Sequence, residues 1–455
     1  MSPVIPKSVL SEMRWPAVPS HQGATQLALD HQLTETQWLP PHELESLQLG
    51  ALGRLLRHAC RTVPYYRHSP AHRDAAGAGD LTAATWRRLP VLTRATVQAD
   101  GPRLRSEAIP DGHTPVKEGT TSGSTGRPVS FLATRVTSLF WMALTLREHH
   151  WHERDLGGRL AVMRVSGREK VPPRGMEHPS WGTGLDAVYD TGPAGLFSIA
   201  RDLSEQAAWL RDQDPDYVMS LPSNLLALAE HFRQAGWKLP RLRQVRSYGE
   251  AMDPGLRDAC REAWGVDVVD LYSSQEVGYM ALQCPRAEHY HVQSESVLVE
   301  VVDDDGNPCH PGQVGRVLVT ALHNYAMPLL RYELGDYAEV GGHCPCGRTL
   351  PVLARVMGRY RNMLRLPTGE RFCPVFSIRS WAHIAAIRQM QVVQTELDHL
   401  EVRIVGPRPL NGPEEEELAG ALREAWRYPF RVSFRYPPAV ERSASLKFES
   451  FVSLV

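Results

Sequence analysis

The sequence predicts a multidomain α/β protein. It would have a large amino-terminal domain with mainly parallel sheets and a β-barrel-like subdomain, followed by a small mobile α+β domain. Its 455 residues are enough for two or three domains of ordinary size. Helix-like and strand-like segments alternate between Thr134 and Tyr279, which is typical of a parallel sheet covered on both faces. After Glu276 the pattern changes to short strands separated by turns.

The amino-terminal part precedes this alternating pattern. Residues 1–40 carry scattered Pro and His without a sustained period, so we expect a loosely ordered arm there. From Pro41, Leu recurs at spacings of three and four residues, which predicts an amphipathic helix that ends before Pro64. A helical lead-in should therefore come before the first sheet.

The central and final parts have distinct textures. Strand-like RLAVMRV, YVMSL, VRSYGEAM and VDVVDLYSS alternate with helix-like segments, and hairpin turns are predicted at Asp305-Gly306 and Pro311-Gly312. From Gly358 the chain reads QMQVVQTELDHLEVRIV, then helical EEEELAGALREAW, then strand-like RVSFRY. We therefore expect domains at residues 1–357 and 358–455.

Composition excludes several classes of function. Fifty Lys and Arg against 51 Asp and Glu leave a formal charge of −1, so no general basic field is present to hold nucleic acid or an anionic membrane. No apolar run approaches the roughly 18 residues of a membrane span, and the start MSPVIPKSVLSEM lacks the order of a signal peptide. We expect a cytoplasmic protein. Its seven unevenly spaced Cys do not suggest a disulfide framework.

The string TTSGSTGRP has the composition of a phosphate-binding loop. Its glycines let backbone N–H groups wrap a polyanion, and its hydroxyls add donors. It is not a Walker loop, because Gly126 is followed by Arg127 and Pro128 rather than by Lys and Ser or Thr. A Ser/Gly-rich surface linker is the alternative. The candidate phosphate-binding residues are Thr120, Thr121, Ser122, Gly123, Ser124, Thr125 and Gly126.

Further strings follow this loop in a fixed order. They are SYGEAM from Ser247, DLYSSQEVG from Asp270, LRYELGD from Leu330, then Gly358-Arg359 and a late Lys447. With LPVLTR at 89–94, this order resembles the adenylate-forming acyl ligase superfamily, most closely its phenylacetate–CoA ligase and CapK-like branch. The resemblance runs from about residue 43 to the end of the chain.

The resemblance implies an activity in two steps. A carboxylic acid, aryl or another small organic acid, would react with Mg·ATP to give acyl-AMP and pyrophosphate. A thiol, that of CoA, would then displace AMP. One alternative keeps adenylation but passes the acyl group to an amine or a carrier protein, and another is a non-catalytic zinc-containing scaffold of the same fold. The protein would be a monomer or a homodimer without nucleic-acid or membrane partners.

The resemblance also implies roles for residues in the DLYSSQEVG and LRYELGD strings. Tyr272 would stack on adenine, and Glu276 would hold Mg²⁺, which prefers one or two carboxylates plus phosphate oxygens. Asp336 would accept hydrogen bonds from the ribose hydroxyls, although an Asp after Gly is equally a turn residue. The family's Tyr-Gly-x-Thr-Glu reads Tyr-Ser-Ser-Gln-Glu here, so Ser273 and Gln275 replace Gly and Thr.

The remaining implied roles fall on the loop after residue 246 and on the final domain. Lys447 would bridge the incoming carboxylate and the α-phosphate in the transition state, with Gln275 and Glu276 completing the catalytic set, whereas a lone late Lys is commonly a surface residue. Arg361 lies at the hinge position. Further ATP-binding residues would be Ser247, Tyr248, Gly249, Glu250, Asp270 and Arg359. The acyl pocket would be lined by Tyr217, Leu221, Ser223 and Tyr248.

A second group of residues suits a metal. Cys344-Pro345-Cys346 forms a Cys-x-Cys turn, and thiolate with imidazole suits tetrahedral Zn²⁺. The resemblance implies a structural zinc bound by Cys284, His291, Cys344 and Cys346, with His291 preferred over His289. Buried or idle free thiols are the alternative.

Overall fold

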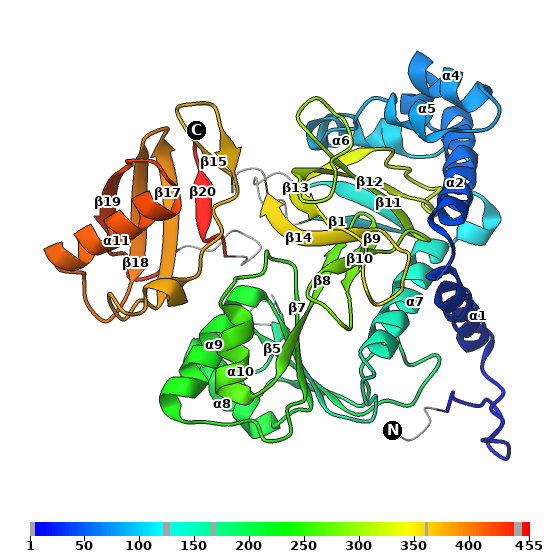
Figure 1. Ribbon diagram of the computed structural model, residues 1–455. Helices are drawn as coiled ribbons and strands as arrows, with labels where there is room; N and C mark the ends of the chain where they lie inside the picture. Colours follow the sequence, from blue (N-terminus) through cyan, green and yellow to red (C-terminus); the bar gives the residue numbers. More distant parts are fainter. Residues whose placement is uncertain (1–4, 122–127, 165–169, 360–362, 441–447) are drawn as a thin grey trace. The chain divides into compact units, whose positions relative to one another are not determined.

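The computed structural model describes residues 5–121, 128–164, 170–359, 363–440 and 448–455 (Figure 1). The chain divides into two compact units. Unit 1 comprises Met1–Val162, Met176–Leu196 and Val269–Val356. Unit 2 comprises Met163–Gly175, Phe197–Val268 and Met357–Val455.

Unit 1 begins with a series of helices, and those from Pro41 onwards agree with the predicted helical lead-in. The helices are α1 (His21–Thr36), α2 (Pro41–Thr62), α3 (Pro64–Arg67), α4 (Pro70–Gly77), α5 (Ala83–Arg87), α6 (Arg94–Asp100), η1 (Gly101–Leu104) and η2 (Asp111–His113). Helix α2 begins with Pro at its first position and ends at the residue before Val63-Pro64, because proline is tolerated in a first turn but disfavours the helical conformation of the residue before it.

Helix α1 corrects the expectation of a loosely ordered arm over residues 1–40. Its amino terminus is capped by Ser20, whose side chain accepts a hydrogen bond from the N–H of Gly23. The helix buries polar residues: Gln26 donates to the carbonyls of Met142, at 3.2 Å, and of Gly184, at 2.7 Å. Because polar groups face inwards, the apolar periodicity by which a helix is recognised is missing.

The strands of unit 1 form a hairpin and a larger antiparallel arrangement. Strands β1 (Val116–Thr120) and β2 (Ser130–Thr134) pair antiparallel, and the capping box of Thr134 and Thr137 then starts α7 (Arg135–Trp151). The larger arrangement has the order β11-β12-β13-β14-β10-β9-β8. Its strands are β8 (Asp267–Ser274), β9 (Gly278–Gln283), β10 (Tyr290–Val292), β11 (Val297–Val302), β12 (Val314–Ala321), β13 (Tyr332–Val340) and β14 (Val352–Arg359).

One apolar core holds unit 1 together. It joins the helices α2, α3 and α5 to the strands β9 to β13, and its members include Leu55, Tyr66, Trp86, Met280 and Val317. Antiparallel pairing of β8 with β9, and of β12 with both β11 and β13, agrees with the hairpin pattern predicted after Glu276.

Unit 2 contains the parallel strands that the alternating pattern predicts. Strands β6 (Tyr217–Ser220) and β7 (Gln244–Tyr248) pair in parallel, and α9 (Pro222–Ala235) connects them. Helices α8 (Leu203–Gln213) and α10 (Leu256–Trp264) flank this strand–helix–strand segment in the chain. The alternating region also contains β3 (Leu160–Arg164) and β5 (Ala194–Ser198), which are divided between the two units, and β4 (Met176–His178), which belongs to unit 1.

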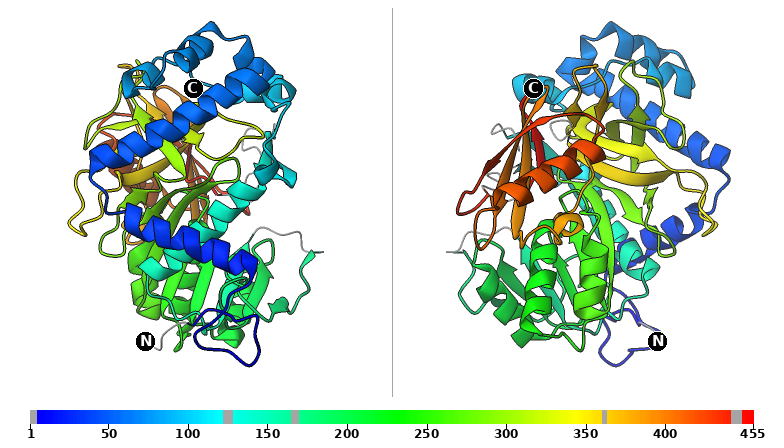
Figure 2. Two further views of the ribbon diagram at one scale, coloured as in Figure 1. Left: turned by 90° about the vertical axis from the view of Figure 1, so that its right-hand side faces the viewer. Right: turned by 60° about the vertical axis from the view of Figure 1, so that its left-hand side comes forward.

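The end of unit 2 is the predicted α+β segment. Its four-stranded sheet has the order β19-β18-β17-β20, and α11 lies along one face of it (Figure 2). The elements are β15 (Leu364–Arg365), β16 (Arg371–Phe372), η5 (Ile378–Trp381), β17 (Gln389–Glu396), β18 (His399–Val405), α11 (Gly412–Ala425), β19 (Arg431–Arg435) and β20 (Phe451–Ser453). The segment has its own apolar core around Trp381, Leu418 and Phe430. The chain enters this part of unit 2 at Met357, next to the predicted division after residue 357.

No helix among the described residues is both long and apolar enough to cross a membrane.

Candidate active site

The turn between β8 and β9 places a buried carboxylate. Strand β8 ends at Ser274, whose hydroxyl accepts from the N–H of Val277 at 3.3 Å, and β9 begins at Gly278. Glu276, in this turn, is only 8% exposed. Burying a carboxylate is costly unless a cation or several donors compensate it, so Glu276 requires a partner.

That partner is Arg94, the first residue of α6. Its Nη1 lies 3.6 Å from Oε1 of Glu276 and donates to the hydroxyl of Tyr332 at 3.4 Å. Its Nη2 donates to Oγ1 of Thr121 at 3.2 Å. One guanidinium thus joins the start of the Ser/Thr/Gly loop, the β8–β9 turn and the LRYELGD string. Arg94 was not among the predicted site residues, although it lies in the LPVLTR string.

Backbone pairing holds Arg94 in this position. The N–H of Leu92 donates to the carbonyl of Arg331 at 3.1 Å, and the N–H of Glu333 donates to the carbonyl of Leu92 at 3.0 Å. These bonds form a parallel bridge between Leu92 and Tyr332. The side chains of Arg94 and Tyr332 are therefore brought together by residues that lie far apart in the sequence.

The two ends of the Ser/Thr/Gly loop meet at the β1–β2 hairpin. Thr120 pairs with Ser130. The N–H of Thr121 donates to the carbonyl of Val129 at 2.9 Å, and the N–H of Val129 donates to Oγ1 of Thr121 at 3.2 Å. The other predicted loop residues lie outside the described part of the chain: Ser122, Gly123, Ser124, Thr125 and Gly126.

The predicted adenine and ribose residues also lie together. The hydroxyl of Tyr272, on β8, donates to Oδ2 of Asp336, on β13, at 3.0 Å. Tyr272 is 7% exposed, and Gly335 supplies the positive φ of 84° that precedes Asp336. Two residues chosen from separate motifs are thus hydrogen-bonded to each other in unit 1.

The other predicted residues of β8 and its turn have different surroundings. Asp270 is buried, and its Oδ2 accepts from the hydroxyl of Tyr290 at 2.7 Å. Ser273 is half-buried beside a register shift between Tyr272 and Ser273, while Gln275 is exposed. Within the string DLYSSQEVG, the side chains of Asp270 and Glu276 thus face inwards and that of Gln275 faces solvent.

The predicted residues of the SYGEAM string lie in unit 2. Ser247 and Tyr248 end β7, and Gly249 adopts a positive φ of 82°. Burial raises the pKa of Tyr248 to about 12, so its phenol stays protonated at neutral pH. Oε2 of Glu250 accepts from the N–H of Ser223, at the first turn of α9, at 3.0 Å.

The remaining predicted residues lie at β6, at the end of β14 or outside the described part of the chain. Tyr217 and Leu221, expected in an acyl pocket, are 3% and 1% exposed at either end of β6 in unit 2. Arg359 is the last residue of β14. Arg361 and Lys447 lie outside the described residues.

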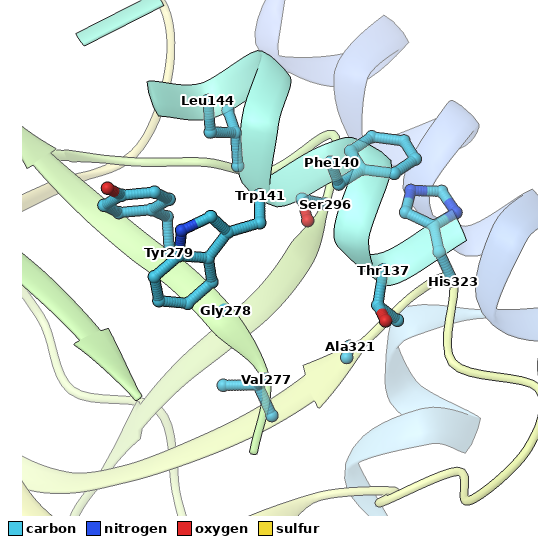
Figure 3. A pocket seen from close by; sticks show the side chains of 10 residues that line it. All are labelled: Thr137, Phe140, Trp141, Leu144, Val277, Gly278, Tyr279, Ser296, Ala321 and His323. Carbon is cyan, nitrogen blue, oxygen red and sulfur yellow. The ribbon is translucent and has the colours of Figure 1, made fainter. Parts of the chain in front are cut away.

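Unit 1 also contains a small pocket beside the β8–β9 turn, which the sequence analysis did not predict (Figure 3). The rings of Trp141 and Tyr279 lie with centroids 4.7 Å apart, and Phe140 stacks on His323 at 3.8 Å. Burial lowers the pKa of His323 to about 4, so its ring is neutral near pH 7. The lining residues are Thr137, Phe140, Trp141, Leu144, Val277, Gly278, Tyr279, Ser296, Ala321 and His323.

The predicted cysteine and histidine residues converge in unit 1. One ligand atom from each of Cys284, His289, His291 and Cys344 lies within 4.8 Å of the others. The Sγ atoms of Cys284 and Cys344 are 3.7 Å apart, and Sγ of Cys346 lies 3.4 Å from Nε2 of His291. Both histidines are therefore within reach of the thiols.

Burial raises the pKa of the Cys284 and Cys344 thiols, and backbone N–H donors act in the opposite direction by stabilising the thiolate. The N–H groups of Arg286, Cys346 and Arg348 each point at a sulfur, those of Cys284, Cys344 and Cys346 respectively, at 3.4 Å. Such a set of thiols, donors and imidazoles suits tetrahedral Zn²⁺. The donor set fits the predicted metal.

No family model matches the chain. The chain is 27% identical over 349 residues to phenylacetate–coenzyme A ligase of Thermus thermophilus, covering 72% of this chain and 73% of that protein. It is 26% identical over 384 residues to phenylacetate–coenzyme A ligase of Escherichia coli, covering 80% of this chain and 82% of that one.

Among solved structures, 2-hydroxyisobutyryl-CoA ligase in its postadenylation state, in complex with an acyl-AMP, matches with a TM-score of 0.72 and 20% identity, covering 91% of this chain and 90% of that one. The chain is therefore similar in sequence to phenylacetate–coenzyme A ligases, and its fold is that of 2-hydroxyisobutyryl-CoA ligase.

Proposed function

We propose that this protein is an AMP-forming acid–thiol ligase. A carboxylate oxygen of the acid attacks the α-phosphorus of ATP, pyrophosphate leaves, and the thiol of CoA then attacks the acyl carbon and displaces AMP. The observation that carries the proposal is the meeting of the Ser/Thr/Gly loop, the β8–β9 turn and the LRYELGD string at Arg94. Sequence similarity to phenylacetate–coenzyme A ligases supports the same reaction class.

The phosphate groups of ATP would be bound at the β1–β2 loop. Val129 stands where the family carries a Lys after the loop, so positive charge must come from elsewhere. It would come from Arg127, magnesium or another cation, and Arg94 is placed to contribute because its guanidinium contacts Thr121 at the start of the loop. An arginine suits this position, since its planar fork contacts several oxygens at once.

Magnesium would be held by Glu276 together with phosphate oxygens. Magnesium is usually bound by one or two carboxylates plus phosphates, and it would neutralise the charge that develops as pyrophosphate leaves. Because Glu276 pairs with Arg94, a bound cation would share this carboxylate with the guanidinium.

The nucleoside would be bound by Tyr272 and Asp336. The phenol of Tyr272 orients the Asp336 carboxylate, which then accepts from the ribose hydroxyls, while the tyrosine ring offers a face to the base. Arg359, Ser247, Tyr248 and Gly249 remain candidates for further nucleotide contacts. The acid would be a small aryl or other organic acid near Tyr217, Leu221, Ser223 and Tyr248.

Lys447 would stabilise the transition state of adenylation. It is the only lysine in the last hundred residues, so no other lysine of that part could replace it. A flexible ammonium can contact both the attacking carboxylate and the α-phosphate. Gln275, the neighbour of Glu276, would be a further catalytic residue. Arg361 would be the hinge about which the carboxyl-terminal domain moves between the two reaction steps.

A structural Zn²⁺ would be bound by Cys284, Cys344 and Cys346 with His291. His289 is the alternative fourth ligand, because its ring lies within the same group of ligand atoms. The metal would join the end of β9, strand β10 and the turn between β13 and β14. It would act in folding, because a closed set of four protein ligands leaves no open position for a substrate.

The proposal is tested by following AMP release from ATP. Purified protein is incubated with ATP, Mg²⁺ and a panel of aryl and small aliphatic acids, with CoA, amines or no acceptor. We expect AMP release that needs both an acid and CoA, together with the matching thioester. Release that needs an amine instead would reassign the acceptor, and no release with any acid would contradict ligase activity and favour a scaffold.

A further inference from the structure

Arg379, in η5 of unit 2, lies between two helices of the same unit. Its Nη1 donates to Oε1 of Glu230, on α9, and its Nη2 donates to Oε1 of Glu262, on α10, at 2.5 Å. The side chains of Arg379 and Glu230 are 22% and 21% exposed. One arginine of the carboxyl-terminal α+β segment is thus bound by carboxylates of two consecutive helices. We call these three residues the Arg379 dock.

The backbone near the dock is shaped for close approach. A Cβ on Gly255, just before α10, would lie 2.4 Å from Oγ of Ser377 and 2.8 Å from Cδ of Arg379. A side chain at position 255 would force the side chains of Ser377 and Arg379 to shift, so Gly255 lets both residues approach the start of α10. Asp253 completes this surface: its Oδ1 accepts from the N–H of Gly255 at 2.7 Å.

A second contact joins the same parts of unit 2. Oε1 of Glu250 accepts from the N–H of Phe448 at 2.7 Å, while its Oε2 accepts from the N–H of Ser223 on α9. Phe448 directly follows residues 441–447, and β20 begins three residues later at Phe451. The α+β segment is therefore attached near both of its ends, through Arg379 at one end and Phe448 at the other.

We propose that Arg379 and Glu250 are positioning residues for acyl-adenylate formation, because they dock the α+β segment on α9 and α10 and fix the chain that leads into β20. This inference rests on the proposed function. Its basis is the geometry of the two contacts, which converge on the helices that border the SYGEAM string. In this proposal both residues act through the segment that they hold and not on the reacting atoms themselves.

The chemistry of the dock suits a reversible attachment. Its ion pairs are partly exposed, and pairs of this kind are individually weak and are weakened further by salt. The dock therefore favours the position of the α+β segment against α9 and α10 but does not hold it there permanently. The second step, in which acyl-AMP reacts with the thiol, should depend on it much less.

The experiment reverses the charge at the dock. Arg379→Glu is compared with Arg431→Glu, a control in the same α+β segment whose partners, Glu396 and Asp398, lie within that segment. We expect Arg379→Glu to lower acid-dependent ATP–pyrophosphate exchange at least tenfold, with little change in KM for ATP. Thioester formation from synthetic acyl-AMP and CoA should change less than twofold. Adding Glu230→Arg should restore a large part of the exchange.

Hydrogen–deuterium exchange supplies a readout that does not depend on activity. Arg379→Glu should speed amide exchange at residues 255–264 and 377–381, and Arg431→Glu should not. Unchanged protection in Arg379→Glu would overturn the docking contact. Faster amide exchange with unchanged pyrophosphate exchange, or equal loss of both half-reactions, would overturn the positioning role. A wild-type protein that adenylates no acid would contradict the proposed function instead, and the amide-exchange result would still decide the contact.

Discussion

Arg94 contacts residues of three predicted motifs. It neutralises a carboxylate that is 8% exposed, and it also orders two hydroxyl groups, those of Thr121 and Tyr332. Removing one partner of a buried ion pair leaves an uncompensated charge, which is more costly than losing the pair as a whole. Substitutions at Arg94 should therefore affect folding and catalysis separately.

Two substitutions separate these effects. Arg94→Ala should lower the free energy of unfolding by about 3 kcal/mol, because Glu276 stays buried without its cation, and should abolish AMP formation. Arg94→Lys keeps the charge but not the fork, so we expect near wild-type stability and a KM for ATP raised roughly tenfold. Urea denaturation and initial rates measure the two quantities. A wild-type KM in Arg94→Lys would contradict a role at the phosphates.

Two tyrosine hydroxyls offer a matched comparison. Tyr272 donates to Asp336 at 3.0 Å, and Tyr290 donates to the buried Asp270 at 2.7 Å. Each change to Phe removes one hydrogen bond to a carboxylate, at a cost of about 1–3 kcal/mol. Tyr272→Phe should also raise the KM for ATP, and by more than Tyr290→Phe does, because Asp336 is the residue expected to contact the ribose. Equal KM values in the two variants, measured at saturating acid, would mean that the Tyr272–Asp336 pair is structural.

Among the elements, those with strong periodicity were predictable and those fixed by distant contacts were not. Leucine spacing predicts α2, and alternation predicts β6, α9 and β7. Helix α1 escaped prediction because Gln26 and Asp30 face inwards, where the pattern expects apolar residues. The position of Arg94 was not predicted, because it depends on the bridge between Leu92 and Tyr332. These two residues lie far apart in the sequence, and no pattern in it shows that they pair.

The cysteine-bearing turn connects several elements of unit 1. Thr349 donates from its N–H to the carbonyl of Gln37 at 3.1 Å, and the Arg348 guanidinium lies 4.4 Å from the ring centre of Trp151, at the end of α7. The indole of Trp151 also donates to Oε1 of Gln37 at 3.0 Å. Order in the turn should therefore stabilise the ends of α1 and α7.

A bound zinc should raise the thermal stability of the protein. We expect about one Zn²⁺ per chain by elemental analysis, and removal by a strong chelator should lower Tm by several degrees, because ligand binding to the folded state stabilises it. Cys344→Ser should lose the metal. Cys309→Ser, which changes a thiol outside the group, should retain it. Full metal content in Cys344→Ser would contradict the ligand assignment.

At the scale of the whole molecule, two compact units carry different parts of the predicted machinery. Unit 1 contains the ends of the phosphate loop, Glu276, Tyr272 and Asp336, and unit 2 contains the SYGEAM string and the α+β segment. The near-zero net charge is compatible with ATP as the proposed substrate if cationic charge is supplied locally, by Arg94 together with a bound Mg²⁺, rather than by a general basic field. Motif order predicted the kind of reaction, whereas the identity of the acid depends on side-chain packing that no motif encodes.

The central claim is that the protein forms an acyl-adenylate, and ATP–pyrophosphate exchange tests it most directly. Exchange is measured for the wild type and Lys447→Ala with a panel of aryl and small organic acids, alongside thioester formation from synthetic acyl-AMP and CoA. We predict exchange that depends on the acid in the wild type and its loss in Lys447→Ala, with thioester formation largely kept. Absence of exchange with every acid in the folded wild-type protein would contradict the claim.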